Sequence, residues 1–390
     1  PVVAPKIPSV KNHNWIQTPI DAFVLSKLES EGIAPSSEAN KITLLKRATE
    51  DMLGLPPTQD EIQAFVNDTA PDAWDKVVDR LLASPQYGER WGRHWLDLAH
   101  YADSEGFKAD ETRPRMWRYR DYVIKSFNDD KPYDRFVQEQ IAGDELYPDD
   151  PQATVALGFL RNFPDESNAE DIPLRRQEIL NDITDTVGSV FLGVTYGCAR
   201  CHDHKFDPIL HKDYYRMQAF FANLKIEDHA LMGTVEEKRS YQEQLAHWEE
   251  QTKGIRDEMH NLLQPRIQAA YNSGLRRFPD DVKQAIARPA NEKSPMDWQV
   301  YWKALPQMEI SDASAAKALN PANRAKYDAL QAALAKYPKP RELPTAQVML
   351  DGSSAAPPVH VLRGGNIDAK AEEVHPGFLS ILDATDAKVT

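Results

Sequence analysis

Apolar residues recur at helical spacing through the first part of the chain. Thr18 and Pro19 stand at an N-cap and first helical position, which predicts a helix that Gly32 ends. A second helix is predicted near 42–54, and Thr58 to Glu61 form a capping box that opens a third. The spacing indicates a fourth helix over 73–83. We therefore expect a helical bundle here, preceded by an extended arm over residues 1–17.

The densest aromatic pattern lies in residues 86–103. It predicts one apolar stripe on a helix, with His94 beside it, made of Trp91, Trp95, Leu98 and Ala102. Two interpretations stay open. The stripe is ordinary core in which His94 is a hydrogen-bonded polar group, or it lines a cofactor pocket that His94 faces.

The strongest single helix is predicted over residues 176–196, where apolar positions share one face. It leads directly to Gly197 and Cys198. Shorter helices are expected near 117–124, 132–141 and 152–160, and an aromatic helix is expected over 213–221.

The pattern changes after Leu224. Residues 235–263 are charged with widely spaced apolar positions, which predicts a long exposed helix or an antiparallel helical hairpin, and residues 313–336 predict an Ala-rich helix. Alternation from Ala346 predicts that 348–350 and 358–365 are two strands of one small sheet. We expect a helical domain over 18–225, a helical hairpin or insertion over 226–345 and a small β segment over 346–390.

Composition narrows the classes of partner. The 390 residues suffice for two or three domains, and 46 basic against 60 acidic side chains give a net charge of −14. Such a surface disfavours nucleic acid and anionic membranes as partners. The sequence also holds no apolar run long enough for a membrane span.

The only two cysteines, Cys198 and Cys201, are separated by two residues and followed at once by His202. This C-x-x-C-H spacing is typical of covalent c-type haem attachment. The thiols add to the two haem vinyl groups, and the histidine is then the proximal iron ligand. Because such attachment takes place outside the cytoplasm, the motif predicts a periplasmic or otherwise extracytoplasmic protein.

Other interpretations of this spacing stay open. A structural zinc site would need four ligands, drawn from the two cysteines, His202 or His204, and a more distant residue. A thioredoxin-like site would need a strand before Cys198, where the pattern is helical. A structural disulfide and free thiols are the remaining alternatives.

Several side chains are candidates for the haem surroundings. His94 is the first candidate for the distal iron ligand and Met217 the second, whereas a vacant sixth position would favour chemistry at the iron. Arg118 and Arg120 are candidates for contacts with the haem propionates, because guanidinium binds carboxylate bidentately. They could equally form a solvated face.

A second cation site is also conceivable near the motif. Asp103, Glu105, His204 and Asp207 together would offer mainly oxygen ligands, the set that Ca²⁺ prefers. Alternatively, Asp207 belongs to a turn before Pro208 and Asp103 ends a helix. His204 lies too close to His202 to reach the opposite face of a haem, so we expect it to anchor the loop, a propionate or a second metal.

The motifs occur in an order that resembles a known family. They are Tyr101 to Ser104, Trp117 to Asp121, Gly143 to Leu146 and the extended stretch Cys198 to Ile209. Over about 18–225, and again over 346–382, the chain resembles the planctomycete-type cytochrome c domain family, secreted proteins with a domain of unknown function. His100 departs from the arginine that is common there.

The resemblance implies an extracytoplasmic protein that is a piece of a larger one, with a further domain downstream, and it implies an association with carbohydrate degradation. We therefore predict a mainly α protein: a helical bundle around a covalently bound haem c, with an exposed helical insertion and a small C-terminal β segment. Its expected role is electron transfer, linked to carbohydrate oxidation, with a redox partner protein or a fused domain.

Two alternatives of other classes stay open beside electron transfer. One is a haem enzyme that acts directly on a sugar or peroxide at an open iron site. The other is a zinc-stabilised structural scaffold. Whether residues 235–336 form an oligomer interface or pack back on the bundle is also left open.

Overall fold

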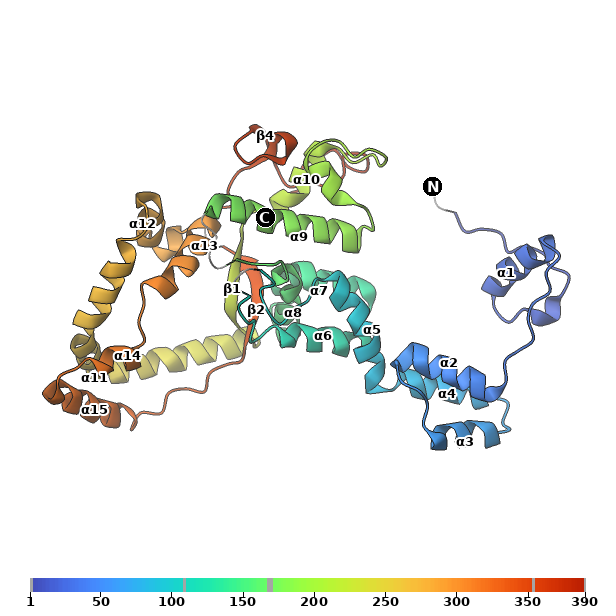
Figure 1. The fold of residues 1–390 in the computed structure, drawn as a ribbon, viewed down its shortest axis with the longest axis horizontal. Coiled ribbons are helices and arrows are strands. Elements are labelled where there is room, and N and C mark those ends of the chain that lie inside the picture. Colours follow the sequence, from blue (N-terminus) through green and yellow to red (C-terminus); the bar gives the residue numbers. More distant parts are fainter. Residues whose placement is uncertain (1–2, 108–109, 167–170, 353–354, 389–390) are drawn as a thin grey trace. The chain divides into compact units, whose positions relative to one another are not determined.

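The computed structural model describes residues 3–107, 110–166, 171–352 and 355–388. The protein is mainly helical, as predicted. It divides into two compact units, Pro1–Ser84 and Pro85–Thr390, which are described separately below. Figure 1 shows the helices and strands of both.

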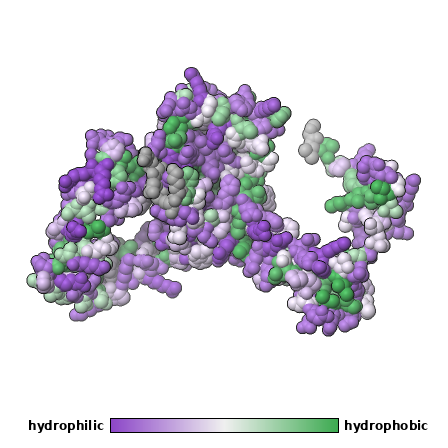
Figure 2. Space-filling view, viewed as in Figure 1, coloured by the Kyte–Doolittle hydropathy of each residue, from purple (hydrophilic) through white to green (hydrophobic). Residues whose placement is uncertain are grey.

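Among its described residues the first unit holds four α-helices, α1 (Pro19–Ser30), α2 (Lys41–Leu53), α3 (Gln59–Asn67) and α4 (Ala73–Leu82). The predicted starts are confirmed, since Thr18 and Thr58 each form a capping box. The core joins only α2, α3 and α4 and consists of Leu45, Phe65, Ala73, Val77 and Leu81. Helix α1 leaves apolar side chains at the surface, among them Ile20, Phe23 and Val24 (Figure 2).

The second unit begins with the helices that carry most of its core. They are α5 (Pro85–Leu98), α6 (Trp117–Asn128), α7 (Tyr133–Leu146), α8 (Pro151–Ala156), α9 (Ile172–Phe191) and α10 (His211–Gln218). Trp95 lies at the centre, where its indole nitrogen donates to Gln140 Oε1 at 2.8 Å and to Tyr119 Oη at 3.1 Å. Side chains such as Phe136 and Phe159 pack around it. The centre of the bundle is therefore occupied by the protein's own aromatic residues.

The buried face of α5 differs from the predicted stripe. Trp95 is buried, but Trp91 is 38% exposed and Leu98 is 51% exposed. The helix instead buries Gly88 and Gly92, which lie against α6. Two glycines on one face let the backbones of α5 and α6 approach closely, and hydrophobicity alone does not reveal this because glycine carries no side chain.

The expected long helix is present as α11 (Val235–Leu275). It is one continuous element of 41 residues, and Thr234 caps its start. The other helices of this region are α12 (Asp280–Ala287), α13 (Pro295–Ala304), α14 (Asp312–Lys317) and α15 (Pro321–Leu334). A small separate core of Leu263, Ala315, Ala316 and Tyr327 packs α11 against α14 and α15. The single Ala-rich helix predicted over 313–336 is two helices, because Asn320 and Pro321 begin a new one. Both lie beside the long helix.

The strands pair differently from the prediction. Strand β1 (Leu224–Leu231) pairs antiparallel with β2 (Thr345–Asp351), and β3 (Val359–Leu362) pairs antiparallel with β4 (Lys370–Val374). The predicted sheet of 348–350 with 358–365 was therefore wrong, because each segment has another partner. Alternation marks a strand but does not specify its neighbour. Since β1 and β2 pair, the intervening helices are an insertion between two strands of one sheet.

Among the residues described, no helix is both long and apolar enough to cross a membrane.

Candidate functional site

The cysteines lie on a tight turn after α9. The helix ends at Phe191, Gly193 adopts a left-handed backbone with a φ of 66°, and Tyr196–Arg200 form a 3-10 turn. The prediction of an unbroken helix to residue 196 was therefore wrong, because a left-handed residue cannot continue an α-helix. Both Cys198 and Cys201 are free thiols and exposed.

A cluster of buried tyrosines supports this turn from the protein side. Tyr196, Tyr214 and Tyr215 are fully buried. The hydroxyl of Tyr196 donates to the Asp213 carbonyl at 2.9 Å, and that of Tyr215 donates to the Arg200 carbonyl at 2.8 Å. Burial raises the pKa of all three phenols, so they stay neutral hydrogen-bond donors. The turn that carries the thiols is thus held on a packed base.

A carboxylate lies directly under the turn. Asp185 of α9 is so close to Gly197 that a Cβ added to this glycine would lie 3.0 Å from Asp185 Oδ2. Burial raises the pKa of Asp185, and its Oδ1 has no hydrogen-bond partner. The nearest cation is Arg200, with Nη1 at 3.9 Å. A side chain at position 197 would therefore press against the Asp185 carboxylate.

His202 is exposed, and one of its ring nitrogens is engaged. Its Nδ1 lies 2.6 Å from the carbonyl oxygen of Asp203, an arrangement in which Nδ1 carries the proton and Nε2 is left with a free lone pair. The Asp203 carboxylate accepts from the His211 amide at 2.7 Å at the start of α10. A backbone carbonyl that orients a histidine in this way is a common feature of metal-binding imidazoles.

The loop after the cysteines is organised by His204. Its Nδ1 accepts from the amides of Asp207 at 2.9 Å and Phe206 at 3.3 Å, and its Nε2 lies 3.0 Å from Thr195 Oγ1. The side chain is 5% exposed, so both nitrogens are used inside the loop. Of the roles expected for His204, loop anchor is the one that these contacts describe.

A distant segment also contacts the site. Gly364 and Gly365, in the turn between β3 and β4, have left-handed φ values of 60° and 73°. A Cβ on Gly365 would lie 2.9 Å from Cys201 Sγ. The absence of a side chain at Gly365 therefore leaves room for the Cys201 thiol, a relation that the linear sequence does not reveal.

Comparison with protein families gives one match. The model of PSCyt2, described as a protein of unknown function (DUF1549), matches residues 19–226, just over half of the chain. The chain belongs to the PSCyt2 family. No curated protein and no solved structure matches it. The matched segment contains the cysteine motif and ends inside β1, and it supports a cytochrome c-type domain of unknown function.

Neither predicted distal ligand of the PSCyt2 segment, His94 or Met217, contacts Cys198, Cys201 or His202 through the bonds and ring contacts of the described residues. His94 is exposed on α5, with its ring 5.5 Å from that of Trp91. Met217 is buried in α10 and lines a cavity of about 390 Å³ to which Cys198, Cys201 and His202 do not contribute. The identity of a distal ligand stays a prediction.

The two arginines proposed for propionates have protein partners. Arg118 Nε donates to the Thr345 carbonyl at 3.0 Å, and its guanidinium lies over the Trp117 ring at 4.5 Å. Arg120 donates to Asp121 Oδ1 at 3.0 Å from Nε and at 2.9 Å from Nη2. These contacts tie α6 to β2 and to its own surface, and the propionate role stays a prediction.

The residues proposed for a second cation belong to separate networks. Asp103 accepts from the Tyr101 hydroxyl at 2.5 Å, whereas Glu105 binds the buried guanidinium groups of Arg113 at 2.6 Å and Arg161 at 3.0 Å. Asp207 lies 3.3 Å from His204. Within the described part of the PSCyt2 chain, no three or more His, Cys, Asp or Glu side chains are grouped as metal ligands. A preformed calcium or four-ligand zinc site is therefore not found there.

Sequence reasoning missed the residues that support the motif. Tyr196 precedes it directly and Tyr215 follows it on α10, but their aromatic rings gave only a general signal for core packing. Asp185 lies 12 residues before Gly197, on α9, and Gly365 is far along the chain. The pair Gly364–Gly365 is the one local signal available, because adjacent glycines are typical of a turn that needs left-handed residues.

Proposed function

We propose that this protein carries a haem c attached covalently to Cys198 and Cys201 and that it is an extracytoplasmic electron-transfer module. One observation carries the proposal: both thiols and the neighbouring imidazole of His202 are exposed on a single supported turn. Such a turn leaves all three groups accessible to one planar macrocycle.

The residues present fit that group in three respects. The thiols are not joined in a disulfide, so both are available for thioether bonds. His202 Nδ1 is engaged with a carbonyl, which leaves Nε2 for the iron. Phe206, beside the motif, is 83% exposed, and an apolar ring at the surface supplies an area that a macrocycle can cover.

The exposed position favours electron transfer over direct catalysis. A bound haem supplies one-electron oxidation and reduction. The chain holds the motif at its surface, above the buried tyrosines, rather than in the aromatic centre of the second unit. A surface haem edge suits exchange with a partner protein or a fused domain, whereas a haem enzyme needs a cleft that excludes water. The link to carbohydrate oxidation rests on the family resemblance alone.

The first test is production of the full chain in a periplasm that has a c-type haem maturation system. We expect a pyridine haemochrome spectrum of haem c and a haem-staining band on a denaturing gel. Cys198→Ser with Cys201→Ser should abolish the covalent band. His247→Ala, an exposed histidine on α11, is the matched control and should leave it unchanged. A wild-type protein without haem, or one that holds zinc stoichiometrically, would contradict the proposal.

The second test separates electron transfer from catalysis at the iron. We expect a six-coordinate low-spin haem that does not bind carbon monoxide when reduced. His202→Ala should keep the covalent band but change the spin state. His94→Ala and Met217→Ala test the two distal candidates in the same spectrum. Ready binding of carbon monoxide by the reduced wild type would instead favour an open iron site.

A further inference from the structure

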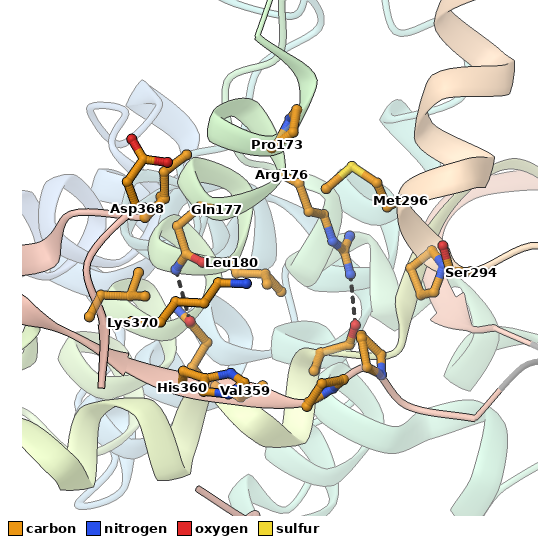
Figure 3. Close-up of a pocket in the computed structure, with 17 residues that line it drawn as sticks. Pro173, Arg176, Gln177, Leu180, Ser294, Met296, Val359, His360, Asp368 and Lys370 are labelled. Carbon is orange, nitrogen blue, oxygen red and sulfur yellow. Dashed lines mark hydrogen bonds between the residues drawn. The ribbon is translucent and has the colours of Figure 1, made fainter. Parts of the chain in front are cut away.

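A cavity of about 360 Å³ lies in the second unit between α9, the start of α13 and the β3–β4 hairpin (Figure 3). None of its lining residues belongs to the cysteine motif. Its size falls within the range of about 300–1,000 Å³ that is usual for small-molecule sites. A ligand site in this cavity would be independent of haem attachment.

The wall formed by α9 contains a buried cation, Arg176, which is only 6% exposed. Its Nη2 donates to the carbonyls of Ala222 at 3.0 Å and Leu224 at 2.7 Å. Within the described ranges, its Nε and Nη1 have no protein acceptor. Both atoms are accessible rather than sealed inside the protein. Three N–H groups of this guanidinium are therefore available from the cavity.

Arg176 differs from the other buried arginines of the described chain in having no carboxylate partner. Each of the others has one within 4 Å, in the pairs Arg113 with Glu105, Arg161 with Asp228, Arg175 with Asp165 and Arg216 with Asp213. Burial alone lowers the pKa of Arg176 to about 10, so the group is still charged at neutral pH. An isolated buried charge is costly, and a bound anion would offset that cost.

One further cation, Lys370, lies on the hairpin side. Lys370 and His360 line the cavity, and Figure 3 shows the Lys370 side chain directed toward the α9 residues. The one acidic lining residue, Asp368, is exposed and lies at the left of this view, on the same side as Lys370, whereas Arg176 lies near the centre. The helix starts at Pro173 and Pro295 also reach the cavity, but the carboxylates of Asp171 and Asp297 already cap them.

The remaining walls are mainly apolar. Their apolar part is formed by Leu180, Val359, Leu362, Ile367 and the prolines Pro173, Pro295, Pro357 and Pro358, while Gln177, Gln218 and Ser294 add neutral polar groups. A fully hydrated inorganic ion gains little from such walls, whereas an apolar body gains about 25 cal/mol per Å² that it removes from water. The cavity therefore combines a cationic wall with space for an apolar group.

We propose that this cavity binds a small organic acid, whose oxyanion pairs with Arg176 and Lys370 and whose compact apolar body contacts Leu180 and the hairpin. The acid is recognised by these two features together. The same cavity should accept an inorganic oxyanion only weakly.

The test is calorimetric titration of the full chain with benzoate, cinnamate and 4-methylpentanoate at constant ionic strength. Inorganic phosphate and glucuronate are titrated as an anion without a body and an acid with a polar body. We expect saturable binding of at least one apolar acid, at least about tenfold tighter than either comparison compound. No saturation by any apolar acid at millimolar concentration, or equal affinity for phosphate, would overturn the proposal.

Variants assign the binding to this cavity. Arg176→Gln should weaken binding of the apolar acid by about 10- to 100-fold, the usual effect of losing a buried charged hydrogen bond. Lys370→Gln should weaken it by about two- to fivefold, a modest effect because Lys370 is exposed. Lys317→Gln, an exposed lysine on α14, is the matched control and should have no effect.

Arg176→Gln also removes two hydrogen bonds to carbonyls, so its fold is checked by circular dichroism. If that variant unfolds, Lys370→Gln at the exposed edge of the cavity decides the question. Unchanged affinity in Lys370→Gln, or in a folded Arg176→Gln, would show that the acid binds elsewhere.

Discussion

Two neighbouring aspartates of the second unit, Asp351 and Asp144, have raised pKa values. Asp351, at the end of β2, lines the cavity of about 390 Å³ together with Glu145 and Asp144 of α7. Asp351 is exposed at the surface, but partial desolvation of its carboxyl raises the pKa of Asp351 to about 6, and a hydrogen bond with Glu145 adds to the shift. Burial also raises the pKa of Asp144. Asp351 and Asp144 therefore titrate at a higher pH than ordinary aspartates.

The raised pKa of Asp351 predicts a pH dependence of stability. Between pH 3.8 and about 6 the folded chain holds a proton that the unfolded chain has released. The stabilisation from this group is therefore complete below pH 3.8 and is lost as the pH rises through about 6. Asp351→Asn keeps the neutral hydrogen-bonding form at every pH. The difference in free energy of unfolding between this variant and wild type should therefore be about 1 kcal/mol more favourable to the variant at pH 7 than at pH 4, after allowance for solvent screening.

Urea unfolding of both proteins at the two pH values measures this difference. Asp281→Asn, an exposed aspartate on α12, is the control and should show no comparable change. Parallel pH profiles for wild type and Asp351→Asn would contradict the assignment.

Helix packing positions the cysteine turn. A Cβ on Gly188 of α9 would lie 2.5 Å from Tyr196 Cβ, so only glycine lets the turn rest on this helix. Gly254 of α11 has no atom within 4 Å of the same added Cβ. An added methyl group should therefore have opposite effects on stability at the two positions. At Gly188 it meets a packing contact, whereas at Gly254 it only reduces the flexibility of an exposed helix.

Gly188→Ala should lower the free energy of unfolding by about 1–3 kcal/mol, because the added methyl group displaces Tyr196. It should also reduce haem incorporation if the proposed function holds. Gly254→Ala, the matched control, should raise the free energy of unfolding by about 0.5–1 kcal/mol and leave haem incorporation unchanged. Chemical unfolding and the haemochrome spectrum check both. A Gly188→Ala protein as stable as wild type would refute the contact.

The whole molecule is two units with separate cores. The core of the first unit lies in α2, α3 and α4, and no residue of the large core around Trp95 comes from residues 1–84. Separate cores predict separate unfolding transitions. The family match nevertheless spans both, since it begins at residue 19.

Scanning calorimetry of the full chain should therefore show two transitions. A chain that begins at Pro85 should lose the smaller one and keep the other within about 2–4 °C, the shift that about 1 kcal/mol produces in a domain of this size. The haem assay on the same shortened chain serves as the second readout. A single transition in the full chain, or unfolding of the shortened one, would show that the two cores are interdependent.

Local sequence was sufficient wherever neighbouring residues decide the outcome. The caps at Thr18 and Thr58 and the stops at Gly32 and Gly54 were predictable, because capping and left-handed backbone depend on a few adjacent residues. The spacing of Cys198, Cys201 and His202 likewise identified the candidate chemistry before any geometry was known.

Tertiary structure decided everything that depends on a distant partner. Strand pairing of β1 with β2, the glycine face of α5 and the contact of Gly365 with Cys201 each join segments that no local pattern relates. The lack of a carboxylate beside Arg176 is of the same kind. Periodicity states which residues seek burial, but only the packed chain determines what each one meets there.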